Sequence, residues 1–248
     1  MAQIGELFDA YGRKARLLPA LITLLPALLT MILLFTPNHA SIAGGVTSLL
    51  IACGATYGLS HVSRYLGRIT ERALIKKWSG LPTTCRLRHR DVAIDSNTKQ
   101  RYHKFLGAHL PGLRMPSAAK EQSDPDSADE IYRSAAKWLT DRTRDHKKFN
   151  LIFEENISYG FRRNSLGLKP VAMAILILSF VAAMGYGYAT HRLDIENWPL
   201  SIWASIALDL VATAYWILVV AEPWVRDAGD AYAHALLGAC DTLSESRA

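Results

Sequence analysis

Four apolar runs, interrupted by one long polar segment, dominate the pattern of hydrophobic and polar positions. The first run, 17–36, is continuous. At about 1.5 Å per residue, a helix of this length crosses a hydrocarbon core of roughly 30 Å. The third and fourth runs, 171–190 and 200–221, are similar, whereas the second, 42–62, is weaker and rich in small residues. The pattern predicts an all-α fold, a four-helix transmembrane bundle with a mostly helical domain inserted between the second and third spans.

The polar segment carries its own helix signals. The second span is expected to continue as a helix through 63–78 and to stop at Ser79-Gly80-Leu81-Pro82. Asp95-Ser96-Asn97 marks a turn or a helix start, and the stretch DPDSAD, 124–129, supplies a capping site before another helix. That helix is expected to run from Asp129 to about residue 158. Within the second span, Gly54-x-x-x-Gly58 favours a close approach of two helices.

Basic residues lie at the same side of every predicted span. Nine of them flank the spans: Arg13, Lys14, Arg16, Arg64, Arg68, Arg72, Arg162, Arg163 and Lys169. The short links within each pair of spans are poor in Lys and Arg. The positive-inside rule therefore predicts a multi-pass protein of the bacterial inner membrane, with both termini and the central segment in the cytoplasm. No small-residue cleavage site clearly follows the first run, so we predict no signal peptide.

This topology divides the chain into four segments. They are an N-terminal segment with the first hairpin, 1–62, a cytoplasmic domain, 63–169, a second hairpin, 170–221, and a cytoplasmic tail, 222–248. Residues 61–170 hold 22 of the 28 Lys and Arg but 12 of the 22 acids, a formal charge of +10. Such an excess favours an anionic partner. Three scattered cysteines argue against a disulfide framework and fit a reducing compartment.

Three basic patches in the central segment are interleaved with aromatic residues. Cations that follow a phosphate backbone and rings that stack on bases are what single-stranded nucleic acid requires. The candidate ligand-binding residues are Arg86, Arg88, Arg90, Lys99, Arg101, Tyr102, His103, Lys104, Phe105, Arg142, Arg144, Lys147, Lys148, Arg162 and Arg163. The alternative is attraction to anionic lipid, worth about 1 kcal/mol per basic residue near the membrane. Beside a span the lipid interpretation is favoured, and farther away the two are balanced.

One carboxylate, Asp209, lies in the middle of the fourth apolar run. An ionised group there is costly, so it must face a partner or water. Ser205 and Thr213 lie one turn away on the same helix face. Two interpretations stay open: the stripe lines an ion path in an oligomer, or a protonated or hydrogen-bonded carboxyl locks the bundle. The expected partners of the carboxyl are Tyr186, Tyr188, Thr56 and Tyr57.

Signatures of catalysis are weak. The sequence has no G-x-S-x-G, no P-loop and no H-E-x-x-H motif. The set His89, His103, His109 and Cys85 matches no standard zinc spacing. We therefore predict a protein that is not an enzyme and that uses neither a metal nor a cofactor.

Three stretches of the central segment carry a resemblance to a known family. LPTTCRLRHRD, RYHKFLGAHLPGLRMPSAAKEQSDPDSADEIY and ENISYGFRRNSLGLKP resemble bacterial four-span membrane effectors of anti-phage defence, of the type found in the Hailong system. The resemblance covers residues 80–170 and extends to the spans only by topology. It implies a homo-oligomeric ion channel or pore former, such as a tetramer, and a nucleotidyltransferase partner that makes the signal.

The implied ligand is an oligodeoxyadenylate strand that holds the channel shut until infection removes it. The basic and aromatic positions given above are where such a strand would lie. The alternative function is a membrane scaffold whose basic loop binds anionic lipid or a protein partner.

Overall fold

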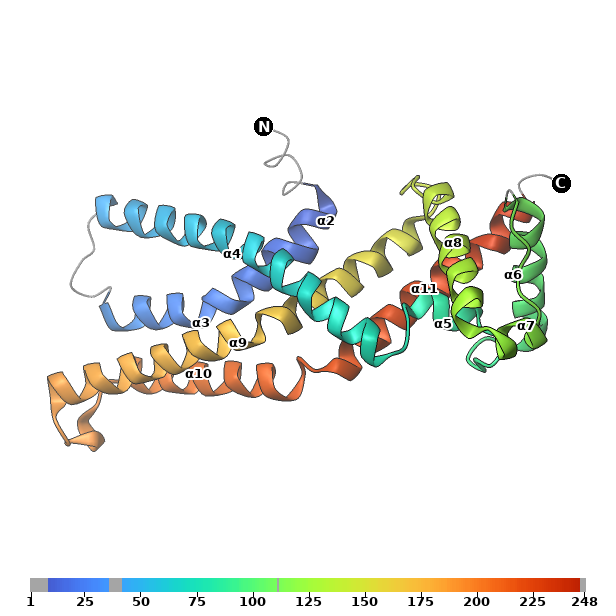
Figure 1. Cartoon of the computed structure of the whole chain (residues 1–248). Coiled ribbons are helices and arrows are strands. Elements are labelled where there is room, and N and C mark those ends of the chain that lie inside the picture. Colours follow the sequence, from blue (N-terminus) through green and yellow to red (C-terminus); the bar gives the residue numbers. More distant parts are fainter. Residues whose placement is uncertain (1–8, 36–41, 111, 246–248) are drawn as a thin grey trace. The chain divides into compact units, whose positions relative to one another are not determined.

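The computed structural model describes residues 9–35, 42–110 and 112–245. The described residues form helices joined by turns, with no strand among them, which confirms the predicted all-α class (Figure 1). Three helical stretches are long and apolar enough to cross a membrane: Ala10–Leu34, Asn150–His191 and Leu200–Leu218. The second of these contains the third predicted span, and the other two cover most of the first and fourth predicted spans, so the chain has the features of a membrane protein.

The second predicted span lies within the long helix α4, Ile42–Lys77. The described part of α4 is not among the three apolar stretches. Residues 36–41 before it, and the side chains of 42–48, lie outside the described residues. The four-span bundle therefore stays a prediction. As expected, α4 continues well past residue 62, and its end is marked by positive φ angles at Ser79 and Gly80.

The chain divides into two compact units, each described here by itself. Unit 1 comprises Met1–Thr70 and Gly160–Trp224. Its apolar helices are α3, Leu18–Phe35, the later part of α9, Asn150–His191, and α10, Leu200–Leu218. One apolar cluster joins Leu34 to Ile202, and a second joins Ile22 to Trp216. The start of α3 therefore lies beside the end of α10, and the end of α3 lies beside the start of α10, so the two helices run antiparallel.

Two glycines set a close crossing of α4 and α9 inside unit 1. A Cβ added to Gly167 would lie 2.7 Å from the backbone nitrogen of Gly67. Asn164, one turn before Gly167, is buried and donates a 2.6 Å hydrogen bond to the carbonyl of Ala15. Residues without a side chain let helix backbones approach. At Gly54 and Gly58, where the sequence also favours close packing, an added Cβ meets nothing within 4 Å.

Unit 2 comprises Glu71–Tyr159 and Val225–Ala248. Its helices are α5, Pro82–Leu87, α6, Ser96–His109, α7, Ala118–Ser123, α8, Pro125–Arg142, the start of α9, and most of α11, Glu222–Glu245. The capping signals at Asp95 and Asp124 are confirmed, since their side chains accept the N–H groups of Thr98 and Ser127. Each cap satisfies a backbone donor that the first helical turn leaves free.

The helix expected from Asp129 to about residue 158 is wrong as a single element. It breaks at 143–149, between α8 and α9. The Thr143 hydroxyl donates to the Leu139 carbonyl, and the Asp145 carboxylate accepts the backbone N–H groups of Lys147 and Lys148. These side chains offer the backbone local partners in place of the helix ladder, so the chain turns here.

The C-terminal segment 222–248 is predicted from the sequence to be a separate cytoplasmic tail. Most of it belongs to helix α11, which is part of unit 2 from Val225 onward. Leu236, Leu237 and Cys240 belong to the apolar core of the unit. Over its sequence, unit 2 has 19 Lys and Arg against 16 Asp and Glu, a formal charge of +3. The acids of α11 therefore offset part of the positive charge that the central segment carries alone.

Candidate ligand-binding surface and intramembrane carboxylate

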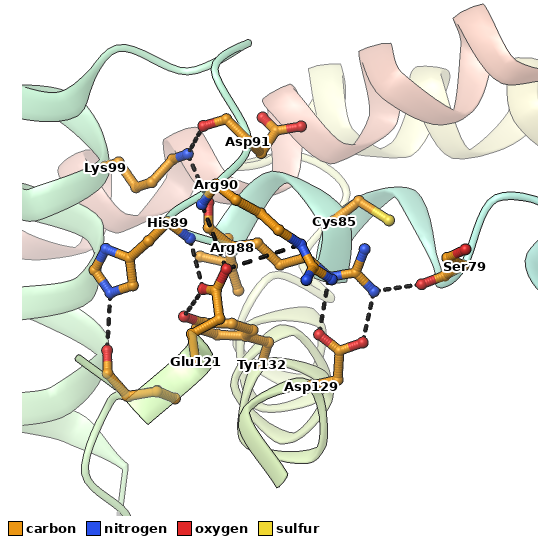
Figure 2. A network of polar contacts seen from close by, with 12 residues as sticks. Ser79, Cys85, Arg88, His89, Arg90, Asp91, Lys99, Glu121, Asp129 and Tyr132 are labelled. Carbon is orange, nitrogen blue, oxygen red and sulfur yellow. Dashed lines mark hydrogen bonds and ion pairs between the residues drawn. The ribbon is translucent and has the colours of Figure 1, made fainter. Parts of the chain in front are cut away.

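Arg88 is buried in unit 2 and holds Asp129 of α8 with two nitrogen atoms (Figure 2). Its Nε donates to Oδ1 at 2.9 Å and its Nη2 to Oδ2 at 2.5 Å. The same Nη2 donates to the backbone carbonyl of Ser79. The hydrogen bond to Asp129 raises the pKa of Arg88 above its ordinary value. This guanidinium ties the residues after α4, the end of α5 and helix α8 together.

Glu121 is a buried acceptor that fixes the turn after α5. Its Oε2 accepts the backbone N–H of His89 and the hydroxyl of Tyr132, both at 2.7 Å, and its Oε1 accepts the backbone N–H of Arg90 at 3.4 Å. Burial raises the pKa of Glu121, but the hydrogen bonds from His89, Tyr132 and Arg90 outweigh it, so the pKa lies below its ordinary value. An ionised Glu121 thus pins the backbone at residues 89 and 90 (Figure 2).

Lys99 and His103 of α6 hold the other side of this turn. The Lys99 ammonium, 5% exposed as a residue, donates to the carbonyls of Arg88, at 2.7 Å, and Asp91. The His103 Nε2 donates to the Leu87 carbonyl at 2.8 Å. Burial lowers the pKa of both side chains because it disfavours their charged forms. Both side chains are engaged with backbone carbonyls of their own unit.

The predicted ligand-binding residues of unit 2 separate by exposure. Six are buried or half-buried: Arg86, Arg88, Lys99, Tyr102, His103 and Phe105. Seven are exposed: Arg90, Arg101, Lys104, Arg142, Arg144, Lys147 and Lys148. Ligand binding stays a prediction for all of them. The seven exposed side chains can contact a ligand without breaking the hydrogen bonds by which Arg88, Lys99 and His103 hold the turn after α5.

Helix α11 supplies acids to two of the predicted cations. The Oδ2 atom of Asp230 lies 2.7 Å from Nη2 of Arg86, and the Oδ2 atom of Asp241 lies 3.0 Å from Nη2 of Arg101. The Arg86 side chain is 13% exposed and also binds Asp91, whereas the Arg101 side chain is 57% exposed. An exposed pair of this kind is weak, so Arg101 can exchange its carboxylate for another anion. Arg86 is held in the interior of the unit.

Aromatic rings join the basic stretch of α6, residues 99–105, to the basic stretch that begins at Arg142 at the end of α8. Phe105 and His109 of α6 have ring centroids 4.3 Å apart, and the rings of both lie about 6 Å from that of Trp138 of α8. The exposed Arg142 lies over the Trp138 ring, 5.1 Å from its centroid. We call Phe105, His109, Trp138 and Arg142 the aromatic–basic cluster. Its three rings are half-buried and therefore keep accessible faces or edges.

Phe105 and Arg142 are among the ligand-binding residues predicted from the sequence, whereas His109 and Trp138 are not. The spacing contains the missing signal. Phe105 and His109 are four residues apart, as are Trp138 and Arg142. On a helix, such pairs lie on the same face. The packing of α6 against α8, which joins the two pairs, is a tertiary contact that the spacing does not predict.

The loop 143–149 continues the combination of rings and cations. His146 stacks on Phe153 with centroids 3.8 Å apart, and the Lys148 ammonium lies 5.5 Å from the Phe149 ring centroid. Arg144 pairs with Asp141 at 2.5 Å but remains highly exposed. Because this loop follows Arg142 directly, Arg144, Lys147 and Lys148 continue a run of exposed cations along the chain from the aromatic–basic cluster.

A pocket of about 500 Å³ opens beside the buried polar network. Its walls are formed by His89, Asp91, Val92, Ile94, Asp95, Ser96, Lys99, Gln100 and His103. The Lys99 ammonium is occupied by backbone carbonyls, and the Asp91 carboxylate is paired with Arg86 at 2.6 Å. The polar groups of the wall are therefore largely engaged within unit 2.

Arg162 and Arg163 lie in unit 1, where α9 enters its apolar run. The Arg162 guanidinium lies 5.3 Å from the Trp224 ring centroid and donates to the Trp224 carbonyl at 2.9 Å. Arg163 donates to the side-chain oxygen of Asn164 at 3.3 Å. A Trp and an Arg held together at the end of an apolar helix are typical of a membrane-interface anchor.

Asp209 of α10 is 1% exposed within unit 1. The Ser179 hydroxyl of α9 donates to its Oδ1 at 3.1 Å, and its Oδ2 has no hydrogen-bond partner. The partner is therefore Ser179 and none of the tyrosine and threonine side chains expected from the sequence. Ser205 and Thr213 donate to backbone carbonyls of α10, at Ser201 and Asp209. The hydroxyls of Ser205 and Thr213 are thus bonded to their own helix, and a polar stripe that lines an ion path stays a prediction.

No protein-family model matches the chain, and no similar curated protein or solved structure was found. Among the described residues, no group of three or more His, Cys, Asp or Glu side chains is placed to hold a metal ion. The function is therefore argued from the two sites themselves, the aromatic–basic cluster and the buried Asp209.

Proposed function

We propose that this chain is a membrane ion channel or pore-forming effector of bacterial anti-phage defence. In this proposal unit 2 lies in the cytoplasm and binds a short single-stranded oligonucleotide, such as oligodeoxyadenylate, which controls an ion path formed by unit 1 in a homo-oligomer. The observation that carries the proposal is the aromatic–basic cluster, where rings from α6 and α8 meet at the start of a run of exposed cations.

The chemistry of single strands supports the cluster as the binding site. Every base has a face that can stack on an aromatic ring, and such stacking is worth about 1–3 kcal/mol per base. The half-buried Phe105 and Trp138 offer rings held in place by the core of unit 2. Lys104, Arg142 and Arg144 are exposed beside them and supply positive charge for the phosphates. Double-stranded DNA hides its base faces, so we expect preference for single strands.

Charge supplies the control mechanism in this proposal. Protomers arranged around an axis bring their exposed cations close together, and a bound polyanion offsets their repulsion. Helices α4 and α9 each contain residues of both units, so they offer continuous routes by which a change in unit 2 reaches the spans. A nucleotidyltransferase partner that makes the strand fits the same scheme.

The test is to identify what the full chain carries after purification in detergent. The extract is treated with DNase or RNase, and any released oligonucleotide is sequenced. A defined short strand supports the proposal and names the signal. Protein that carries no nucleic acid and does not bind added oligodeoxyadenylate contradicts it.

Matched variants locate the binding site. Arg142→Ala and Trp138→Leu remove a cation and a ring of the cluster, and each should weaken binding of a fluorescent oligodeoxyadenylate at least tenfold. Lys120→Ala removes one exposed cation from α7, where Lys120 pairs with Asp124 at 3.0 Å, and should change binding little. Equal losses in Arg142→Ala and Lys120→Ala, with no loss in Trp138→Leu, would mean that the strand responds to net charge alone.

A second candidate function is a membrane scaffold that binds anionic lipid. It is favoured by Arg162 and Trp224, whose contact marks a membrane-surface anchor at the start of an apolar run. This function predicts that purified protein retains anionic lipid and no nucleic acid. Lipid extraction and mass spectrometry on the sample used for oligonucleotide sequencing separate the two candidates.

A further inference from the structure

The three apolar helices of unit 1 enclose a polar layer between two apolar clusters. Leu34, Ala183 and Ile206 belong to one cluster, and Leu176 and Trp216 to the other. Ser179 lies on α9 between Leu176 and Ala183, and Asp209 lies on α10 between Ile206 and Trp216. Their side chains meet across this gap. The apolar clusters on either side separate the carboxyl group from the two ends of the bundle.

Helix α3 packs against both apolar clusters, with Ile22 in the cluster of Trp216 and Leu34 in the cluster of Ile206. Between them it carries Thr30, which is 3% exposed and whose hydroxyl has no hydrogen-bond partner among the described residues.

Among the described residues, no basic group is placed to neutralise the carboxyl. Between Leu18 and Phe35, α3 has no ionisable side chain, and the apolar part of α9 has only Tyr186 and Tyr188. Besides Asp209, α10 carries only Tyr215, and the described apolar part of α4 carries Cys53, Tyr57 and His61, which are exposed. Lys169, at the start of the α9 run, donates to the carbonyls of Ile217 and Val220. Within the part of the chain that the structure describes, the Asp209 carboxyl forms no ion pair and has one hydrogen-bond partner, Ser179.

We propose that Asp209 is a proton-binding site inside the protomer, and that its neutral acid form holds α9 against α10. An ionised carboxylate with one hydroxyl donor and a bare oxygen would lie in apolar packing, which is costly. A proton on Oδ2 removes that charge and supplies a donor. A hard metal cation takes about six or more oxygen ligands, which is more than the Asp209 carboxylate and the Ser179 hydroxyl supply together. The layer fits a proton.

This inference rests on the packing of α3, α9 and α10 alone and does not depend on nucleic-acid binding. It also assigns the carboxyl a place within one protomer. If unit 1 forms an ion path, loss of the proton is a second control: the charged group must acquire water, and the contact between Ser179 and Asp209 must open to admit it.

The test is infrared difference spectroscopy on the full chain in lipid nanodiscs, between the unmodified protein and Asp209→Asn at neutral pH. We expect a carbonyl band of a protonated carboxylic acid that the variant lacks. Ser179→Ala should shift the band, because it removes the hydrogen bond, and Ser205→Ala should leave it unchanged. Raising the pH should remove the band and lower the melting temperature of the unmodified protein, while Asp209→Asn stays constant.

Two results would overturn the proposal. A difference spectrum without a protonated-acid band at neutral pH means that Asp209 is ionised. A melting temperature that rises with sodium concentration only when Asp209 is present means that the layer binds a metal cation. Oligonucleotide binding measured on the same samples reports separately on the proposed function, so the failure of one does not imply the failure of the other.

Discussion

The guanidinium of Arg88 donates hydrogen bonds from Nε and Nη2 to the two carboxylate oxygens of Asp129, which lies 41 residues further along the chain. Such a two-point contact fixes both distance and orientation. It joins the end of α5 to α8, and with Glu121 and Lys99 it holds the turn 88–91 on the surface of unit 2. The network thereby positions the helices that carry the aromatic–basic cluster.

Removal of one partner of this ion pair should loosen unit 2. Asp129→Ala leaves a buried guanidinium without its carboxylate, which costs about 3 kcal/mol. Asp126→Ala removes an exposed carboxylate from the first turn of the same helix and should cost much less. Hydrogen exchange followed by mass spectrometry measures the effect at residues 79–95. Equal protection of this segment in both variants would contradict the role assigned to Arg88.

The half-buried His103 should make unit 2 less stable in mild acid. Burial lowers the pKa of His103, so the folded unit prefers the neutral ring. The associated stability is complete above about pH 6.5, the ordinary pKa of histidine, and is lost as the pH falls from there toward the lower folded-state pKa. His103→Gln should remove this part of the pH dependence, whereas the exposed His234→Gln should keep it. Melting curves between about pH 8 and pH 5 provide the measurement.

The α4–α9 crossing predicts a contrast between two glycine substitutions. Gly167→Ala places a methyl group 2.7 Å from the Gly67 nitrogen, where the backbone must move, and overpacking of this kind costs about 1–3 kcal/mol. Gly54→Ala adds a methyl group that meets nothing within 4 Å of this chain. The melting temperature in detergent should fall for Gly167→Ala and stay unchanged for Gly54→Ala. A lower melting temperature of Gly54→Ala as well would indicate a contact at Gly54 with a second copy of the chain, which a measurement of the oligomeric state of this variant would test.

The pair of Arg101 and Asp241 predicts a gain of ligand affinity. Asp241→Asn frees an exposed guanidinium on α6, so a single strand should bind more tightly. If Arg101 then contacts a phosphate, the slope of log affinity against log salt should steepen by about 0.7. Asp126→Asn makes the same change of charge and should leave the slope unchanged. Fluorescence anisotropy over a salt series measures both, and identical slopes would remove Arg101 from the binding surface.

The all-α class and three of the apolar stretches could be predicted from the sequence, because runs of apolar residues and capping signals act locally. The cap at Asp95 and the stop after α4 are of this kind. Contacts made by distant residues could not be predicted. The run CRLRHRD has three similar arginines, yet Arg88 is buried and paired with Asp129, whereas Arg90 is exposed.

The same limit explains the two surprises at the sites. Asp230 and Asp241 lie far along the chain from Arg86 and Arg101, so charge counts over 61–170 omit them. For Asp209, helix spacing identifies Ser205 and Thr213 as neighbours, but the hydrogen-bond partner comes from a different helix. Only the packing of α9 on α10 selects Ser179.

The most direct test of the central claim is ion flux through purified full-length protein reconstituted in liposomes, measured with and without added oligodeoxyadenylate. The account predicts a flux that changes at least tenfold when the strand is added, and that Arg142→Ala responds only at higher strand concentration. A flux that is absent under both conditions, or that is the same with and without the strand, would contradict an ion path controlled by nucleic acid.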